Sequence, residues 1–505
     1  MKKIKICLLL FVGMFISCDD ALDIKQPGQV DPTETYATMA GFRKNLVGVY
    51  GTLSYESTIS FSSIFTDEVG IGFANGGQGL NDGTYSYLLN AGSDAPSSIW
   101  YAYYNSIANC NRLIKGSELV PHTEEETAEF NHIIAQAKAI RAFSYFQLLS
   151  YFSTDLTNDD ALGVMSFDYV ADKNTPSIPR SKNGDVFAFI NADLDFVDDN
   201  LLDVLTFDED ANPVYYITPN FVTALRARMA LYRGDIVNAQ SYAQDLINLV
   251  PLTPKSTYRQ IWSDQINGEC IFKMSRSIND ATIGSIWASV NATVTGSPFF
   301  EMGRSLYNTF SGSYETDIRI MTSQGGVAGT GQVLLHPSAL VDSDYLNSPD
   351  YRNSDILPIA KYTRSESTNL LGDVKVFRVS EMYFIKAEVQ IADGNLSGAA
   401  ATIRQVRNAR FGSTQPLPTF LNEKEAYAGI LLERRKELAY EGHRYLDLKR
   451  LAVKADVTID RDSKDCSFNN SCNFSNTDYR LVSLPIPTSE LSANPFIRGQ
   501  QNPGY

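Results

Sequence analysis

The pattern of apolar and polar positions predicts helices in several separate parts of the chain. From Ile133, small or apolar residues recur every three or four positions as far as Ser144, and the segment then becomes apolar on nearly every side. A helix of this kind must be covered by its neighbours. Two helix pairs are also predicted, each around a Gly turn: 221–232 with 236–248, and 380–392 with 396–410.

The two helix pairs align with each other at an offset of 160 residues. On this alignment Gly234 matches Gly394, and Ala227 matches Ala387. Alanine lets two helices approach closely, and the pattern resembles tetratricopeptide-type repeats. We therefore expect a mainly α fold with tetratricopeptide-like helical repeats within about 38–60, 98–152, 218–250 and 378–451.

Two segments interrupt the helical pattern. Residues 61–99 contain GIGFANGGQGLNDG, in which six glycines disfavour a stable helix. Residues 251–376 mix Ser, Thr, Gly, Pro and aromatic residues without sustained periodicity. Connections this long in a compact protein are usually functional or form a subdomain. We expect irregular loops and short strands in these two insertions.

Composition and charge exclude several functions. The chain has 505 residues, of which 44% are hydrophobic and 20% charged, as in globular proteins. Its 58 acidic and 43 basic residues give a net charge of −15, and such a surface repels phosphate backbones. Nucleic acid is therefore not an expected partner. The four His residues have no local ligand spacing and no EF-hand loop is present, so no metal site is predicted.

The N-terminus has the features of a targeting segment. A basic start precedes an apolar run of 11 residues, Ile6 to Ile16, which is too short to span a membrane. Ser17 directly before Cys18 resembles a bacterial lipoprotein cleavage site, in which the cysteine becomes the lipidated first residue. We expect a signal peptide over 1–17 and a single domain over 18–505; an ordinary secreted protein cleaved nearby is the alternative.

The remaining cysteines agree with an exported protein. Cys466 and Cys472 enclose five residues of a polar segment, a loop that can close as a disulfide in an oxidising compartment. Cys110 and Cys270 lie in apolar patterns and are expected to be buried and free.

A string near the C-terminus carries a specific pattern. ILLERRKELAYEGHRYLDLKRL, residues 430–451, is predicted to be a helix, and it resembles the signature of the SusD/RagB family of outer-membrane nutrient-binding lipoproteins, E-R-x-x-E-L-x-x-E-G-x-R-x-x-D-L-x-R. The matching positions are Glu433, Arg434, Glu437, Leu438, Glu441, Gly442, Arg444, Asp447, Leu448 and Arg450. Three more blocks are similar to those of the family, in the same order: SIWYAYYNSIANCNRLI, FRVSEMYFIKAEVQIADGN and LPIPTSELSANPFIRGQQNPGY.

We interpret these blocks first as architecture. Glu433, Glu437 and Glu441 recur every four residues, on one face of the predicted helix, where basic side chains can pair with them. Trp100, Tyr101 and Tyr104 in the first block have helical spacing and are interpreted as core residues. The carboxylates are therefore expected to be ion-paired rather than catalytic.

The resemblance also implies a function. Members of this family are cell-surface lipoproteins that bind oligosaccharides or other nutrients, and they cover a partner SusC-like TonB-dependent transporter without performing catalysis or needing a cofactor. Asp19 and Asp20 after Cys18 resemble the surface-export signal of such lipoproteins. The resemblance thus implies a lipid-anchored protein on the outer face of the outer membrane.

Candidate ligand residues follow from the chemistry of sugars and from the family's use of irregular insertions for binding. Aromatic rings pack against sugar C–H faces, and planar polar side chains bind hydroxyls. The candidates are Asp67, Asn75, Gln78 and Tyr85 in the first insertion and Trp287, Phe299, Phe300 and Tyr307 in the second. Trp287 is the first choice among these candidates, because it lies in a Ser- and Gly-rich stretch outside the repeats.

Three other functions remain open from the sequence. The chain could be a peptide- or protein-binding member of the same family, or a helical-repeat scaffold without catalysis. A glycoside hydrolase would need two opposed carboxylates about 5–9 Å apart, and no segment outside the family blocks suggests a catalytic domain.

Overall fold

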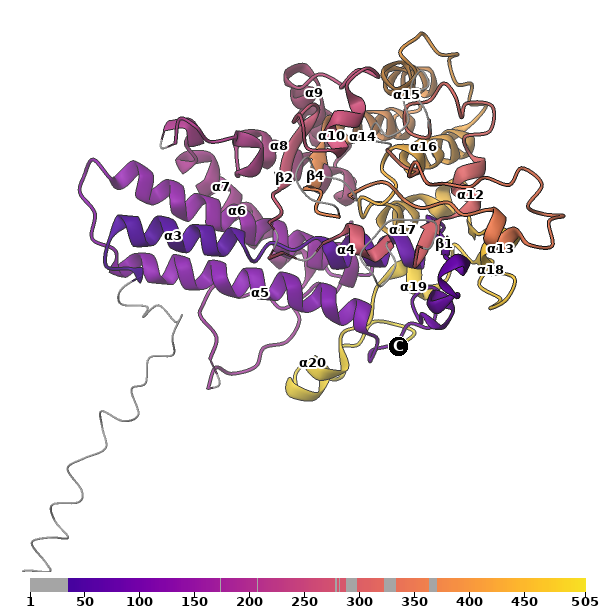
Figure 1. The fold of residues 1–505 in the computed structure, drawn as a ribbon. Helices are drawn as coiled ribbons and strands as arrows, with labels where there is room; N and C mark the ends of the chain where they lie inside the picture. The colour runs from indigo at the N-terminus through magenta and orange to yellow at the C-terminus, as the bar shows by residue number, and fades with distance from the viewer. Residues whose placement is uncertain are drawn as a thin grey trace, which may run out of the picture.

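The computed structural model describes residues 35–172, 174–206, 208–277, 279–280, 282–287, 298–321, 333–362 and 370–505. Within these ranges the protein is mainly helical, as the sequence predicts, with short strands and loops between the helices (Figure 1). The predicted signal peptide and Cys18 lie outside the described residues. In the described ranges, we find no helix whose length and apolar character would let it cross a membrane.

The N-terminal half forms a layer of long helices that lie alongside one another (Figure 1). These helices are α3 (Met39–Tyr50), α4 (Glu56–Phe65), α5 (Asp94–Gly116), α6 (Thr127–Phe152) and α7 (Asn183–Asn200). Helix α6 packs against α3, α5 and α7, and from Ile133 to its end nearly every side chain is buried. This burial confirms what its all-round apolar pattern predicts. Helix α7 was not predicted from the sequence.

The second layer is a stack of helix pairs. It contains α8 (Pro219–Arg233), α9 (Ile236–Leu249), α14 (Val379–Ala392), α15 (Leu396–Phe411), α16 (Glu423–Glu437) and α17 (Arg444–Ala455). Gly234 and Gly394 adopt left-handed conformations, with φ of +76° and +74°, at the turns of the two predicted pairs. Although the pairs are far apart in sequence, α14 packs directly against α9, so that they form one continuous stack.

One helix prediction was wrong. The pattern over 430–451 predicts a single helix, but α16 ends at Glu437 and α17 begins at Arg444. Tyr440 and Gly442 between them have φ of +65° and +82°, which a continuous right-handed helix cannot contain.

The two insertions pair with each other. Strand β1 (Val69–Ile71) of the first insertion runs antiparallel to β3 (Phe300–Met302) of the second, with Gly70 opposite Glu301. The other strands also form two-stranded sheets: β2 (Cys270–Met274) pairs with β4 (Val374–Arg378), and β5 (Ile459–Asp460) pairs with β6 (Asn473–Phe474). Segments that sequence places 230 residues apart are therefore adjacent.

Short helices complete the fold. The 3-10 helices are η2 (Phe73–Asn75), η3 (Gln78–Asn81), η4 (Ser117–Leu119), η5 (Val204–Thr206) and η6 (Pro213–Tyr215). The short α-helices are α10 (Tyr258–Trp262), α11 (Gly284–Trp287), α12 (Arg304–Asn308), α13 (Tyr351–Ser354), α18 (Ser463–Cys466), α19 (Tyr479–Val482) and α20 (Thr488–Ala493). The glycine-rich stretch thus forms two single 3-10 turns, as its composition allows.

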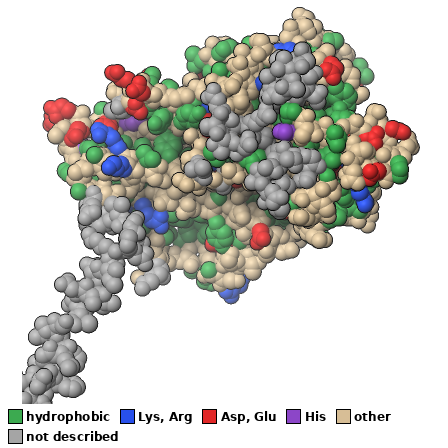
Figure 2. All heavy atoms as spheres, viewed as in Figure 1, with side chains coloured by type: hydrophobic (Ala, Val, Ile, Leu, Met, Phe, Trp, Pro, Cys, Tyr) green, Lys and Arg blue, Asp and Glu red, His purple; other side chains and the backbone are tan. Residues whose placement is uncertain are grey.

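The hydrophobic core extends through both layers. Trp100 is 1% exposed, which agrees with its interpretation as a core residue, whereas Tyr101 is 42% exposed, so that interpretation was wrong for Tyr101. Cys110 and Cys270 are buried and free as predicted. Burial raises the pKa of Cys270 to about 12. On the face shown in Figure 2, acidic side chains lie mostly toward the two ends of the molecule.

Candidate functional site

The charged residues of the C-terminal blocks form a buried ion-pair cluster. Arg378, the last residue of β4, donates through Nη1 to Glu437 at 2.9 Å and to Glu269 at 2.7 Å. Its Nε and Nη2 both donate to Glu441 at 2.8 Å. Arg410 in α15 joins the cluster by donating to Glu269 and Glu437. All five side chains are at most 2% exposed, so each charge depends on its partners.

The pKa of Glu437 shows what this cluster does chemically. Burial alone would raise it, but the charges of Arg410, Arg378 and Arg319 outweigh burial and hold the pKa of Glu437 well below its ordinary value. The three arginines therefore favour the ionised form of this carboxylate. Glu437 and Glu441 are thus ion-paired, as the spacing of the glutamates predicts.

Other residues of the same string link distant elements. Arg434 in α16 pairs with Asp447 in α17 at 2.7 Å, and Arg450 in α17 pairs with Glu388 in α14. Arg444 pairs with Asp67 of the first insertion at 2.8 Å. The charged side chains of the string over 430–451 therefore hold the helix stack to the first insertion.

Asp67, a candidate ligand residue, is part of this ionic architecture. Its carboxylate accepts hydrogen bonds from Nε and Nη2 of Arg444, at 2.8 and 2.9 Å, and lies 3.4 Å from Arg435. Burial alone would raise the pKa of Asp67, but the charges of Arg435 and Arg444 lower it by more, so that the resulting pKa is about 2. Asp67 is 2% exposed and both its oxygens are engaged, so it does not face a surface ligand.

Four other candidates also lie in the core: Trp287, Tyr85, Phe300 and Tyr307. The ring of Trp287 is fully buried, with its centroid 5.3 Å from that of Tyr440. The hydroxyl of Tyr85 donates to the carbonyl oxygen of Asp465 at 2.8 Å. Since these rings are at most 7% exposed, they do not offer a face to a ligand at the surface.

Three candidates remain accessible: Asn75, Gln78 and Phe299. The backbone brings them together, because Gly72 donates its N–H to the carbonyl oxygen of Phe299 at 3.0 Å. A Cβ atom on Gly72 would lie 1.7 Å from the carbonyl oxygen of Pro298, so this approach requires glycine. The side-chain Nδ2 of Asn75 is buried and has no hydrogen-bond partner in the described part of the chain.

Next to Asn75 lies a set of aromatic residues that the sequence did not single out. The aromatic cluster comprises Phe73, Tyr351 and Phe468, all of them partly exposed. The ring of Phe73 meets that of Phe468 at 4.9 Å and that of Tyr351 at 6.4 Å, edge to face in both pairs. The guanidinium of Arg352 lies 4.6 Å from the Phe73 centroid.

The cluster combines three separate parts of the chain at one end of the molecule, where α13, α18 and β1 lie (Figure 1). Phe73 is in η2, Tyr351 is in α13, and Phe468 follows α18. Two signals in the sequence could have indicated it: an aromatic residue within a glycine-rich run, and another inside a loop bounded by two cysteines.

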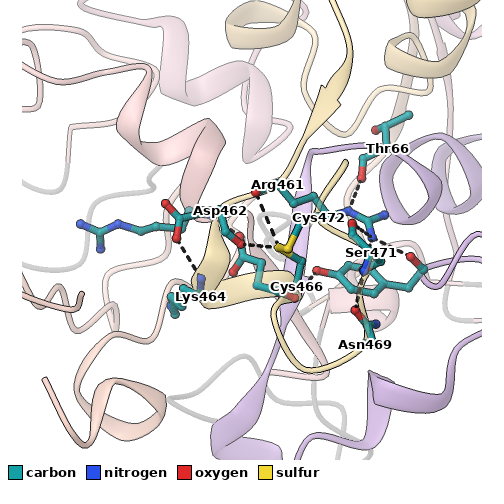
Figure 3. Close-up of a disulfide and its surroundings, with 11 residues drawn as sticks. Thr66, Arg461, Asp462, Lys464, Cys466, Asn469, Ser471 and Cys472 are labelled. Carbon is teal, nitrogen blue, oxygen red and sulfur yellow. Dashed lines mark hydrogen bonds between the residues drawn. A yellow bond between two sulfur atoms is a disulfide. The ribbon is translucent and has the colours of Figure 1, made fainter. Parts of the chain in front are cut away.

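The loop that carries Phe468 is closed by a disulfide between Cys466 and Cys472 (Figure 3). Arg461 fastens this loop to the end of α4 by donating to the carbonyl oxygen of Thr66 and to the hydroxyl of Ser471, both at 2.9 Å (Figure 3). These bonds restrict where the loop can lie, and therefore where Phe468 can be presented.

Sequence comparison agrees with this architecture. The model of the SusD family matches residues 330–505, which contain the string over 430–451. SusD-like protein P2 of Formosa agariphila is 24% identical over the full length of both chains. SusD-like protein P38 of the same organism is 22% identical over 90% of this chain and 93% of its own. The C-terminal part of the chain, residues 330–505, thus matches the SusD family, and the full-length relatives are SusD-like proteins.

Solved structures share the SusD fold with this chain. A SusD superfamily protein from Bacteroides thetaiotaomicron superposes with a TM-score of 0.72 at 21% identity, covering 92% of this chain and 100% of that one. A protein from Bacteroides vulgatus described as a putative sugar binding protein gives a TM-score of 0.70 at 21% identity, covering 93% and 99%.

The accessible groups at this end of the molecule are suited to contacts with a ligand. Rings, an amide and a guanidinium can pack against a ligand and hydrogen-bond to it. In the described ranges, no group of three or more His, Cys, Asp or Glu side chains is arranged to hold a metal ion. We therefore treat the aromatic cluster, with Asn75, Gln78 and Phe299, as the candidate ligand site.

Proposed function

We propose that this chain is a cell-surface glycan-binding lipoprotein that captures oligosaccharides and delivers them to a SusC-like TonB-dependent transporter. The observation that carries the binding role is the aromatic cluster beside Asn75, whose Nδ2 has no partner among the described residues. A sugar ring would pack on the partly exposed rings, and its hydroxyls would supply the missing acceptor.

The surrounding residues extend this site. Gln78 is exposed in η3, and Phe299 is partly exposed where β3 begins. Both belong to the insertions, which the ladder between β1 and β3 holds together. A site built by paired insertions on a rigid helical stack is pre-organised for binding.

Binding to a panel of soluble oligosaccharides and insoluble polysaccharides tests this proposal. We expect Phe73→Ala and Phe468→Ala to weaken binding about tenfold or more, because each removes a stacking surface of the kind that contributes on the order of 1–2 kcal/mol. Phe496→Ala is the matched control, since Phe496 is 57% exposed and lies outside the cluster. Equal loss in the control, or none in either variant, would contradict the site.

Trp287→Ala separates the two kinds of aromatic candidate. Because Trp287 is fully buried, its truncation should lower stability by about 3–5 kcal/mol and leave the affinity of the folded protein nearly unchanged. A large loss of affinity without a loss of stability would instead restore Trp287 as a ligand residue.

Calorimetry with peptides and an assay for release of reducing ends examine the alternatives. Peptide binding that depends on Phe73 would identify a peptide-binding family member, and sugar release would identify a hydrolase.

For localisation, we expect labelled palmitate to be incorporated by the full chain and not by Cys18→Ala. Copurification with a TonB-dependent transporter from membranes tests the delivery step.

A further inference from the structure

A cavity of about 330 Å³ lies on a different part of the molecule, between α3, η6 and the end of β2. It shares no lining residue with the aromatic cluster. Its apolar walls are Val47, Leu53, Phe272 and Met274, and three tyrosines also line it: Tyr50, Tyr215 and Tyr216. This volume is at the lower end of the range for small-molecule sites, so it fits one or two sugar rings rather than a long chain.

The tyrosines of this cavity are not equivalent. The hydroxyl of Tyr50 accepts a hydrogen bond from the N–H of Ile217, and that of Tyr215 donates to Asp373, both at 2.7 Å. Tyr216 is partly exposed, its ring meets that of Tyr50 at 6.1 Å, and its hydroxyl has no partner in the described part of the chain. Tyr216 is therefore the ring free to pack against a ligand.

Arg276 gives the cavity a polar wall. Its side chain is 8% exposed and forms an ion pair with Glu56, but its Nε has no hydrogen-bond partner among the described residues. A buried N–H without a partner is costly, and an acceptor oxygen from a ligand would offset that cost. The hydroxyl of Ser275 and the carboxylate of Asp280, both exposed, supply further polar groups on the same wall.

The charges around the cavity decide the class of ligand. Arg276 is balanced by Glu56, and Lys273 lies 3.3 Å from the carboxylate of Asp373. The charge of Arg276 also acts on the carboxylate of Asp280, so both cations of the lining, Lys273 and Arg276, have acidic neighbours. An anionic ligand would be repelled by the carboxylate of Asp280, and no cation without an acidic neighbour lines the cavity to attract it.

We propose that this cavity is a second binding site, for a neutral pyranose ring. The ring packs against Tyr216, and its hydroxyls accept from Nε of Arg276 and donate to the carboxylate of Asp280. The site does not depend on the aromatic cluster, so the protein holds a short neutral saccharide here whether or not Phe73 carries a ligand.

Saturation-transfer NMR on the protein truncated before Cys18 tests the proposal with glucose, galactose, mannose, xylose, cellobiose, maltose and glucuronate as probes. At least one neutral sugar should bind, and its signal should persist in Phe73→Ala. Tyr216→Ala should weaken that binding at least tenfold, whereas Tyr216→Phe should retain it. Val47→Trp, which places a large ring at the 70% exposed rim of the cavity, should also block binding.

Val453→Trp is the control for Val47→Trp, because Val453 is 65% exposed on α17 and does not line the cavity. Thermal unfolding of each variant shows that the fold is kept. The second site is refuted if no neutral probe binds, or if binding survives both Tyr216→Ala and Val47→Trp. Stronger binding of glucuronate than of every neutral sugar would overturn the assignment of ligand class. Loss of binding in Phe73→Ala alone would place the ligand at the aromatic cluster instead.

Discussion

Phe73 and Phe468 meet edge to face, with ring planes at 90° and centroids 4.9 Å apart, although they are 395 positions apart in the sequence. Phe73 belongs to the glycine-rich first insertion, and Phe468 lies in the disulfide-closed loop near the C-terminus. The contact joins two segments that have no local relationship, and it builds the candidate ligand surface at one end of the helical stack.

Removing the disulfide should weaken both the loop and the ligand site. For the double variant Cys466→Ser and Cys472→Ser, we expect a loss of about 2 kcal/mol in the free energy of unfolding, because the open loop gains conformational freedom in the unfolded state. Affinity for the glycan should fall as well, since Phe468 is no longer held against Phe73. Ser467→Ala, an exposed position in the same loop, should change neither quantity. Unchanged affinity in the double variant would show that Arg461 alone positions the loop.

Glu437→Gln should be strongly destabilising. The substitution leaves Arg378 and Arg410 with less compensating charge in a fully buried cluster, and the loss of one partner from such a cluster costs about 3–5 kcal/mol. Denaturant unfolding measures this change. On the same helix, Glu423→Gln should stay within about 0.5 kcal/mol, because Glu423 is exposed. A small effect at Glu437 would mean that the arginines find other partners.

Glu68 should make stability depend on pH. Burial raises its pKa to about 7, from the ordinary 4.5, so the folded protein holds a proton that the unfolded chain releases between these values. The stability that this proton on Glu68 contributes is complete below about pH 4.5 and is lost as pH rises through 7. Each unit of the pKa shift corresponds to about 1.4 kcal/mol in the free energy of unfolding.

Glu68→Gln should therefore flatten the decrease in unfolding free energy between pH 4.5 and 7. Part of the decrease should remain, because burial also raises the pKa of Asp465 to about 7. Glu124→Gln, at an exposed position, should leave the pH profile unchanged. An identical profile for Glu68→Gln and the original protein would show that Glu68 is ionised in the fold.

Gly72→Ala should disturb the junction of the two insertions. The added Cβ would lie 1.7 Å from the carbonyl oxygen of Pro298, so the strand pair beside it must shift, at a cost of about 1–3 kcal/mol. Glycan affinity should also fall, since Phe73 and Phe299 flank this contact. Gly48→Ala provides a control of opposite sign: no atom lies within 4 Å of its Cβ position in α3, and the change should stabilise the helix by about 0.5–1 kcal/mol. Equal effects in both variants would contradict the steric argument.

The sequence determined those features that depend on residues close together in the chain. The period of apolar residues located the helix pairs, and the spacing of the glutamates indicated ion pairing rather than catalysis. The family blocks indicated the SusD/RagB family. The glycine-rich composition of 70–83 excluded a long helix there.

Tertiary structure alone decided which aromatic and polar side chains reach the surface. Trp287 and Phe73 both lie in irregular insertions, yet Trp287 is fully buried while Phe73 is partly exposed. The carboxylate of Asp67 is engaged by Arg444, which lies 377 residues further along the chain. Burial and pairing arise from contacts between distant segments, and local patterns contain no information about which segments will meet. For this reason the residues named from the sequence include only part of the candidate site that we propose.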